Sequence, residues 1–206
     1  RMFDEFCKIF LTKQALDNFK KLNSFGVLKY LINTREYNEH TFDLKFQHAA
    51  LINTDNRLKA SKSVTPGFLI AALLWPRLID SSKDKGNLNL RKFFRSMDGT
   101  IREQQVLTAV PRKFHSYIKD IWSLQLKLET RLGHQPYKIL NHPRFRAAYD
   151  FLLLREEAAQ DKQGIGEWWT QFQKINRPGK IELLKRLRES RSGPVEKKFG
   201  FLEELS

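Results

Sequence analysis

Lys and Arg residues recur in two segments, 111–131 and 143–160, whose apolar residues fall at helical spacing. Most of these cations lie beside the apolar stripe rather than within it, so they are free to point at a partner. Lys and Arg donate charge-assisted hydrogen bonds to phosphate oxygens. If the two helices pack as neighbours, their cations form one phosphate-binding surface. The residues expected there are Arg112, Lys113, Lys119, Lys127, Arg131, Lys138, Arg144, Arg146 and Arg155. The alternative is a solvated helix face, on which Arg146 pairs with Asp150 four residues later.

Aromatic side chains beside these cations are candidates for stacking on nucleic-acid bases. Tyr137 and Tyr149 are the expected stackers, because both lie next to basic residues. Most other aromatic residues, including Trp122, follow apolar stripes and are expected in the core. Trp168 and Trp169 are adjacent, so we expect one of them at a surface or a seam between domains.

Catalytic motifs are absent from this sequence. Nucleotidyl transfer by two metal ions needs carboxylates held close together, often as Asp-x-Asp, yet no two acidic residues here are separated by one position. There is also no glycine-rich phosphate loop, no His-Glu-x-x-His and no G-x-S-x-G motif. The five histidines lack ligand spacing. We therefore expect no catalytic residue, no metal ligand and no bound cofactor in this chain.

The charge balance favours a polyanionic partner. The chain has 206 residues and a net charge of +14, from 37 Lys and Arg against 23 Asp and Glu. Binding a polyanion releases counterions from it, so nucleic acid is the leading partner class. No apolar run approaches the roughly 20 residues that span a bilayer. The single cysteine, Cys7, suits a reducing compartment, so we expect the cytoplasm. The chain starts at Arg1 rather than at Met, which suggests a piece of a longer protein.

The hydrophobic pattern predicts an all-α fold without a sheet. Short helices are expected within residues 2–32 and over 41–51, followed by a helix over 67–75 that Pro76 ends or kinks. Residues 80–89 are polar and are expected to form an exposed loop. Further helices are predicted over 90–105, 111–131, 143–160, 164–175 and 181–190.

Several short motifs resemble the RNA-binding, carboxy-terminal part of bacterial poly(A) polymerases, which are related to the tRNA CCA-adding enzymes. They occur in the order of that family along nearly the whole chain, although Gly67 stands where the family usually has Ala. The motifs are RMFDE at 1–5, NTDNR at 53–57, VTPGFL at 64–69, AALLW at 71–75, IWSLQL at 121–126, HPRFRAAYD at 142–150 and WWTQF at 168–172.

The resemblance implies a particular organisation and function. Residues 1–80 would be a helical body, 81–176 an arginine-rich leg and 177–206 a basic tail. It adds Arg57, from the second motif, to the RNA-binding residues. A catalytic head upstream would add adenylates from ATP, with Mg²⁺, to single-stranded RNA 3′ ends and so tag RNA for decay. This piece would guide the RNA, would not catalyse by itself, and would be a monomer. A helicase or nuclease of RNA decay is the expected protein partner.

Two other functions are compatible with the sequence. The equivalent region of a CCA-adding enzyme would prefer the acceptor end of tRNA. A non-enzymatic helical module would instead use its basic face to dock an acidic protein, and would bind RNA weakly.

Overall fold

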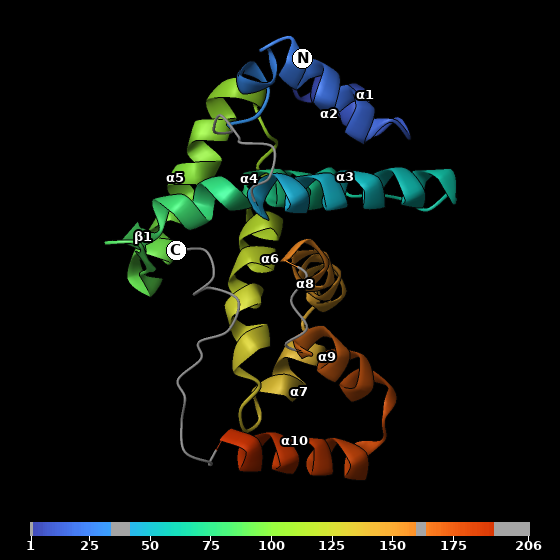
Figure 1. Ribbon diagram of the computed structural model, residues 1–206, viewed down its shortest axis with the longest axis vertical. Helices are drawn as coiled ribbons and strands as arrows, with labels where there is room; N and C mark the ends of the chain where they lie inside the picture. The colour runs from blue at the N-terminus through green and yellow to red at the C-terminus, as the bar shows by residue number, and fades with distance from the viewer. Residues whose placement is uncertain (1, 34–41, 160–163, 192–206) are drawn as a thin grey trace.

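The computed structural model describes residues 2–33, 42–159 and 164–191, and these residues are almost entirely helical (Figure 1). The predicted all-α fold is confirmed. The first motif's Arg1 and residues 192–206 of the predicted basic tail lie outside the described residues. In chain order the elements are α1 (Met2–Phe10), α2 (Ala15–Ser24), the 3₁₀ helix η1 (Leu28–Tyr30), α3 (Phe42–Lys59), α4 (Pro66–Ser81), β1 (Lys83–Asp84), β2 (Asn87–Leu88), α5 (Leu90–Thr108), α6 (Lys113–Thr130), α7 (Gln135–Leu140), α8 (Phe145–Ala159), α9 (Ile165–Lys174) and α10 (Arg177–Arg191).

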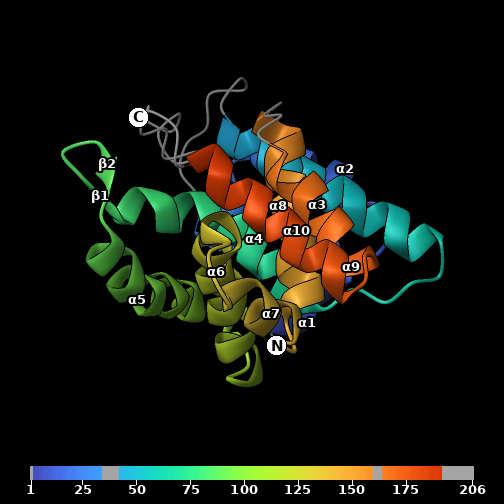
Figure 2. The same ribbon diagram turned by 90° about the horizontal axis from the view of Figure 1, so that it is seen from below.

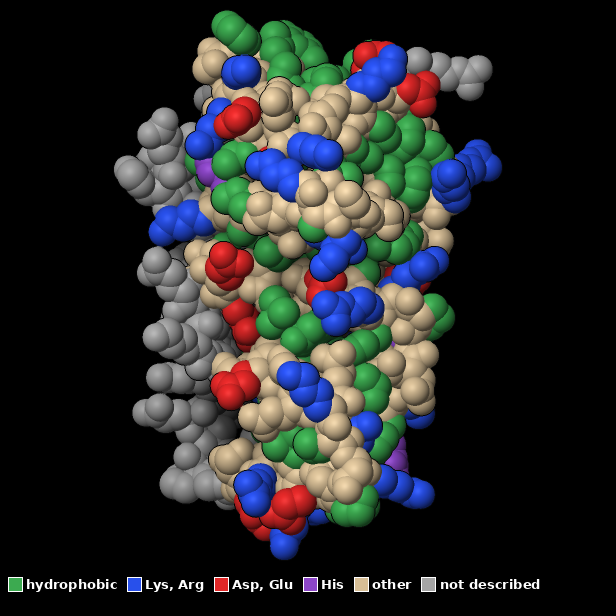
Figure 3. All heavy atoms as spheres, turned by 90° about the vertical axis from the view of Figure 1, so that its right-hand side faces the viewer, with side chains coloured by type: hydrophobic (Ala, Val, Ile, Leu, Met, Phe, Trp, Pro, Cys, Tyr) green, Lys and Arg blue, Asp and Glu red, His purple; other side chains and the backbone are tan. Residues whose placement is uncertain are grey.

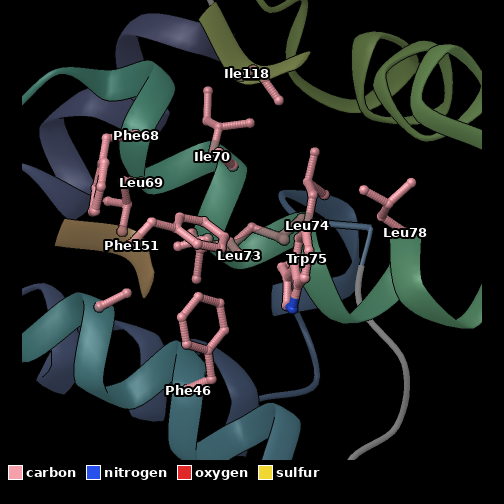
Figure 4. Close-up of a cluster of buried hydrophobic side chains, with 14 of the residues drawn as sticks. Phe46, Phe68, Leu69, Ile70, Leu73, Leu74, Trp75, Leu78, Ile118 and Phe151 are labelled. Carbon is pink, nitrogen blue, oxygen red and sulfur yellow. The ribbon is translucent and has the colours of Figure 1, made fainter. Parts of the chain in front are cut away.

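Helix α4 forms the centre of the larger hydrophobic core. Residues 67–76 of this helix are all buried, because α3, α5 and α6 pack around it. Phe151 of α8 closes the core from another side, with its ring centroid 5.3 Å from that of Trp75 and 5.0 Å from that of Phe46 (Figure 4). A helix that is apolar all round is stable only when it is enclosed in this way.

A second hydrophobic cluster lies at the other end of α6. It joins that end to α8 and α9 and is centred on Trp169, whose indole N–H donates to the Leu128 carbonyl oxygen at 2.9 Å. Leucines of α10 pack against this cluster, and Figure 2 shows α10 lying across this end of the molecule. The two clusters do not divide at residue 80, since α5, α6 and α8 all contribute to the first one.

Of the two outcomes expected at Pro76, an end or a kink, the end is not found, since α4 continues to Ser81. A proline in a helix interior removes one backbone hydrogen bond. Neighbouring helices bind the carbonyl groups just before it: the indole N–H of Trp122 donates to the Ala71 oxygen at 3.0 Å, and the Gln47 amide donates to the Leu73 oxygen at 2.7 Å. These tertiary contacts hold the turn of α4 that precedes its proline.

The segment expected to be a loop forms the end of α4 and a small hairpin. Strands β1 and β2 pair in an antiparallel register, with Lys83 opposite Leu88. The two residues between them, Lys85 and Gly86, both have positive φ, as two-residue hairpin turns require. The expectation of no sheet is wrong at this point, because strands of two residues are too short to produce an alternating pattern.

Trp168 and Trp169 are both buried, so neither is the surface tryptophan that was one of the two expected placements. Trp169 is inside the second cluster, and Trp168 stacks on Phe172 with ring centroids 4.8 Å apart. The guanidinium of Arg131 covers the Trp168 ring at 5.4 Å from its centroid. The long cationic side chain of Arg131 therefore shields Trp168 from solvent. Helical periodicity does not reveal a contact of this kind, because the covering residue lies at the end of another helix.

Asp55 links two helices that are distant in sequence. Its carboxylate accepts hydrogen bonds from the backbone N–H of Ala15 at 2.7 Å and of Leu16 at 3.3 Å, at the first turn of α2. The carboxylate thus satisfies donors that a helix start leaves without an intrahelical partner. Asp55 is the central residue of the motif at 53–57. That motif therefore has a structural role in addition to supplying the proposed RNA-binding residue Arg57.

Replacing Asp55 by Ala should lower the free energy of unfolding by about 1–2 kcal/mol, the usual cost of losing a helix N-terminal acceptor. Chemical denaturation followed by circular dichroism measures the change. Asp84→Ala, an exposed aspartate of β1, is the control and should change stability by less than about 0.5 kcal/mol. Equal losses in the two variants would contradict the capping role.

Candidate nucleic-acid interface

A polar cleft of about 280 Å³ lies between the end of α3, the segment 63–65, α6 and the start of α8. Its lining comes mainly from three of the motifs, those at 53–57, 64–69 and 142–150, which are far apart in the sequence. The lining residues are Asn53, Arg57, Ser63, Val64, Thr65, Phe68, Tyr117, Pro143, Arg144, Arg146, Ala147 and Asp150. Convergence of these motifs makes the cleft the candidate site.

Arg57 enters the cleft from the last turns of α3. Its Nη2 donates to the backbone oxygen of Ser63 at 3.2 Å, across the turn that follows α3. This single contact orients the guanidinium and leaves most of its five N–H donors available to a ligand. Arg57 is therefore a preoriented cation at the rim of the cleft.

Arg144 also lines the cleft, and its guanidinium carbon lies over the ring of Tyr117, 4.8 Å from the ring centroid. The backbone N–H of Arg144 donates to Nδ1 of His142 at 3.1 Å, which shapes the chain just before α8. Tyr117 is a residue of α6, so this contact joins α6 to α8. A cation over an aromatic face keeps its edge directed outward, where its N–H groups can bind an anion.

Tyr117 forms the floor between the two arginines. Burial raises the pKa of its phenol, and hydrogen bonding to Thr65 and the charge of Arg144 oppose that rise. The phenol is therefore neutral and acts as a hydrogen-bonding group. Gly67 leaves space for this ring: a Cβ at position 67 would lie 2.9 Å from Cδ1 of Tyr117 and 3.0 Å from Cδ1 of Phe114. Gly at position 67, where the family usually has Ala, thus allows α6 to pack closely against α4.

Arg146 and Asp150 form an ion pair at one edge of the cleft. Nε of Arg146 lies 3.1 Å from Oδ1 of Asp150, which is the i,i+4 pairing considered as the alternative for this helix. The Arg146 side chain is nevertheless 74% exposed, and that of Asp150 is 25% exposed. Since an exposed i,i+4 pair is weak, Arg146 can exchange this partner for a phosphate.

The structure brings only three of the proposed phosphate-binding residues, Arg57, Arg144 and Arg146, into one cleft. Lys119 instead pairs with Asp98 of α5, with Nζ 2.7 Å from Oδ1. Lys127 and Lys138 are exposed elsewhere, on α6 and α7. Figure 3 shows Lys and Arg side chains spread among acidic and apolar ones on one face, rather than gathered in a single stripe.

The other four residues predicted to bind phosphate do not line the cleft. Three of them contact other parts of the protein, and one is exposed elsewhere. Arg131 is largely buried over Trp168, and Arg155 is fully buried. Lys113 extends over the ring of Phe114, 5.2 Å from its centroid, and Arg112 is exposed just before α6.

The two proposed stacking residues differ in how far protein covers them. Tyr149 is only 6% exposed, its ring stacks on Phe145, and its hydroxyl is 2.6 Å from Oγ1 of Thr170, so it is not available for stacking in this conformation. Tyr137 is partly exposed, packs edge to face against Phe172 with centroids 5.4 Å apart, and does not line the cleft.

Asn53, Thr65, Tyr117 and Asp150 line the cleft but were not among the proposed site residues. Three of them belong to the motifs that carry the family resemblance, and that membership was the signal that could have identified them. Tyr117 had no such signal, since its position on α6 resembles that of any half-buried aromatic residue.

Among residues 2–33, 42–159 and 164–191, no three His, Cys, Asp or Glu side chains are grouped so that they could hold a metal ion. No helix in the same ranges is both long and apolar enough to cross a membrane.

Comparison with known proteins identifies the family of the chain. Residues 85–199 match the family described as the polymerase A arginine-rich C-terminus. Proteins named poly(A) polymerase I are similar over nearly the whole chain. The relative from Escherichia coli O157:H7 is 30% identical over 202 residues, and those from Salmonella typhi and Haemophilus influenzae are 29% and 28% identical.

These alignments cover 93%, 91% and 96% of this chain, respectively, but only 43%, 42% and 46% of the relatives. The chain thus spans less than half the length of the curated relatives that it matches. Because the family match extends over more than half of the chain, the chain belongs to the polymerase A arginine-rich C-terminus family.

Proposed function

We propose that this chain is the RNA-binding part of a bacterial poly(A) polymerase and guides single-stranded RNA 3′ ends to an adenylyltransferase active site outside these 206 residues. The observation that carries the proposal is the cleft in which Arg57, Arg144 and Arg146 converge from two motifs that are far apart in the sequence. Three guanidinium groups around one cleft suit a phosphate backbone, and the net charge of +14 favours its approach.

The wider parts of the proposal rest on the family. ATP and Mg²⁺ would be bound by the catalytic part of the polymerase. The adenylated RNA would be marked for decay in the cytoplasm, with a helicase or nuclease as protein partner. Within this chain, the cleft residues hold and orient RNA, and their contribution is positional and electrostatic.

We expect this chain to bind a short, fluorescently labelled single-stranded RNA with strong salt dependence. Three phosphate contacts in the cleft predict a slope of about −2 or steeper in a plot of log K against log salt, since each contact to a single strand contributes about −0.7. Fluorescence anisotropy across a salt series measures this slope. Circular dichroism on the same sample establishes that the chain is folded.

Competition separates the proposed function from its alternatives. Unlabelled single-stranded RNA should displace the probe better than a DNA duplex or a folded tRNA. Preference for tRNA would indicate the CCA-adding branch instead. Absence of RNA binding by the folded chain at low salt would overturn the proposal and favour a module that docks an acidic protein.

A further inference from the structure

The cleft combines its cations with hydrogen-bonding groups that a simple phosphate site does not need. Asp150 places a carboxylate in it, and a carboxylate repels a phosphate at close range. Asn53 faces the same cleft from α3. A ligand that satisfies this lining must carry hydroxyl groups as well as negative charge, which describes a sugar–phosphate unit.

We propose that the cleft binds one ribonucleotide unit of the RNA and recognises its 2′-hydroxyl through Asp150 and Asn53, so that it selects RNA over DNA. This inference rests on the proposed RNA-binding function and assigns specificity to two residues outside the basic set. The 2′-hydroxyl is both a donor and an acceptor, and it is the group that distinguishes RNA from DNA.

Asp150 has acceptor capacity left for such a hydroxyl. Within the described residues, its ion pair comes from a single N–H group, Nε of Arg146, which lies 3.1 Å from Oδ1 and 3.3 Å from Oδ2. A carboxylate offers about four lone-pair positions. A ribose hydroxyl can therefore donate to Asp150 without breaking the contact that orients it.

Asn53 supplies the complementary partner. Its side-chain amide makes no hydrogen bond to any residue in the described part of the chain, although it is only partly exposed and lines the cleft. An amide carries both donors and an acceptor, so it can donate to the oxygen of the same hydroxyl. Asn53 and Asp150 thus offer the cleft an amide and a carboxylate that can both bind a hydroxyl group.

The volume and the lining of the cleft limit the size and type of ligand that it can bind. Its volume of about 280 Å³ is below the range of roughly 300–1,000 Å³ that is usual for drug-sized ligands, so it suits one sugar–phosphate unit. The guanidinium of Arg144 covers the face of Tyr117, and this ring is therefore not a platform for a base. The base would extend out of the cleft, and selection would depend on the sugar rather than on the base sequence.

The test compares three oligonucleotides of one base sequence by anisotropy: RNA, DNA and 2′-O-methyl RNA. The folded wild-type chain should bind RNA roughly tenfold more tightly than the other two, the effect of one hydrogen bond to a charged group. The methylated RNA removes the donor while retaining an oxygen at the 2′ position. Equal affinity for RNA and 2′-O-methyl RNA would overturn the inference.

Asp150→Ala should reduce the RNA-to-DNA ratio to near one, because RNA loses the hydrogen bond from its 2′-hydroxyl. Removal of the negative charge should favour RNA and DNA equally and so should not affect the ratio. Asp98→Ala is the matched control, since Asp98 is also paired with a cation, Lys119, but lies on α5 away from the cleft. It makes the same charge change and should leave the ratio unchanged. A ratio that survives Asp150→Ala would refute the assignment.

The ribose site and the RNA-binding function can be tested separately, because different results would exclude each of them. Salt-sensitive RNA binding without discrimination of the 2′-hydroxyl removes the ribose site and leaves the RNA-binding function standing. Loss of all RNA binding in the folded wild-type chain removes both. If Asp150→Ala does not fold, the comparison of RNA with 2′-O-methyl RNA on the wild-type chain still decides the inference.

Discussion

Replacing Arg155 by Ala is expected to lower the free energy of unfolding by about 3–5 kcal/mol, the largest single-residue effect that we predict for this chain. Arg155 is fully buried between the two hydrophobic clusters. Its Nη1 donates to Oε1 of Gln125 at 3.0 Å and its Nη2 to Oε1 of Glu129 at 3.2 Å. Its guanidinium carbon also lies 4.8 Å from the ring centroid of Trp75.

The expected loss has two physical sources. Truncation leaves the Glu129 carboxylate, which is only 18% exposed, without this cation, and it opens a cavity beside Trp75. Urea denaturation followed by circular dichroism provides the measurement. Arg186→Ala is the control, because its pair with Glu182 is on the surface of α10 and should be worth less than about 0.5 kcal/mol. Similar denaturation midpoints for the two variants would show that the buried pair contributes little.

The second large effect concerns RNA affinity. Replacing Arg57, Arg144 and Arg146 together by Gln should raise the Kd for single-stranded RNA roughly 100-fold, at about 1 kcal/mol for each charge-assisted contact. The salt slope should become shallower by about two units, since about 0.7 is lost with each phosphate contact. Anisotropy titrations at several salt concentrations give both quantities from one data set.

A matched variant separates the cleft from overall charge. Arg91, Arg95 and Arg102 are exposed on α5, and α5 lies on the opposite side of α6 from α8 in Figures 1 and 2. Replacing these three by Gln changes the net charge equally and should alter Kd only a few-fold through the long-range field. If both triple variants weaken binding to the same extent, RNA is held by diffuse electrostatics and not by the cleft.

The helices were largely predictable because their signals are local. Each depends on apolar residues three or four positions apart, so α5, α6, α8 and α9 were anticipated within a few residues of their ends. Two of the departures depend on distant contacts. Pro76 is tolerated inside α4 because Trp122 and Gln47 bind neighbouring carbonyl groups, and Trp168 is buried because Arg131 covers it.

The candidate site was predictable only in part. The basic composition indicated a polyanion, and the motifs indicated the family, but neither decided which cations share a surface. Arg155 and Lys119 occupy helical positions that resemble those of Arg144 and Arg146, yet one is enclosed beside Trp75 and the other pairs with Asp98 of α5. Helical spacing describes one helix at a time, whereas burial and ion pairing depend on the helix packed against it.

The sequence by itself determined the all-α class, the family and the positive charge, because these follow from local periodicity, short motifs and composition. Only the tertiary structure decided that Arg57 and Arg144 line one cleft together with Tyr117, Asp150 and Asn53, and that Arg144 lies over the Tyr117 ring. The physical reason is that packing of α3, α6 and α8 around a shared core sets these positions, and that packing depends on contacts between residues distant in the chain.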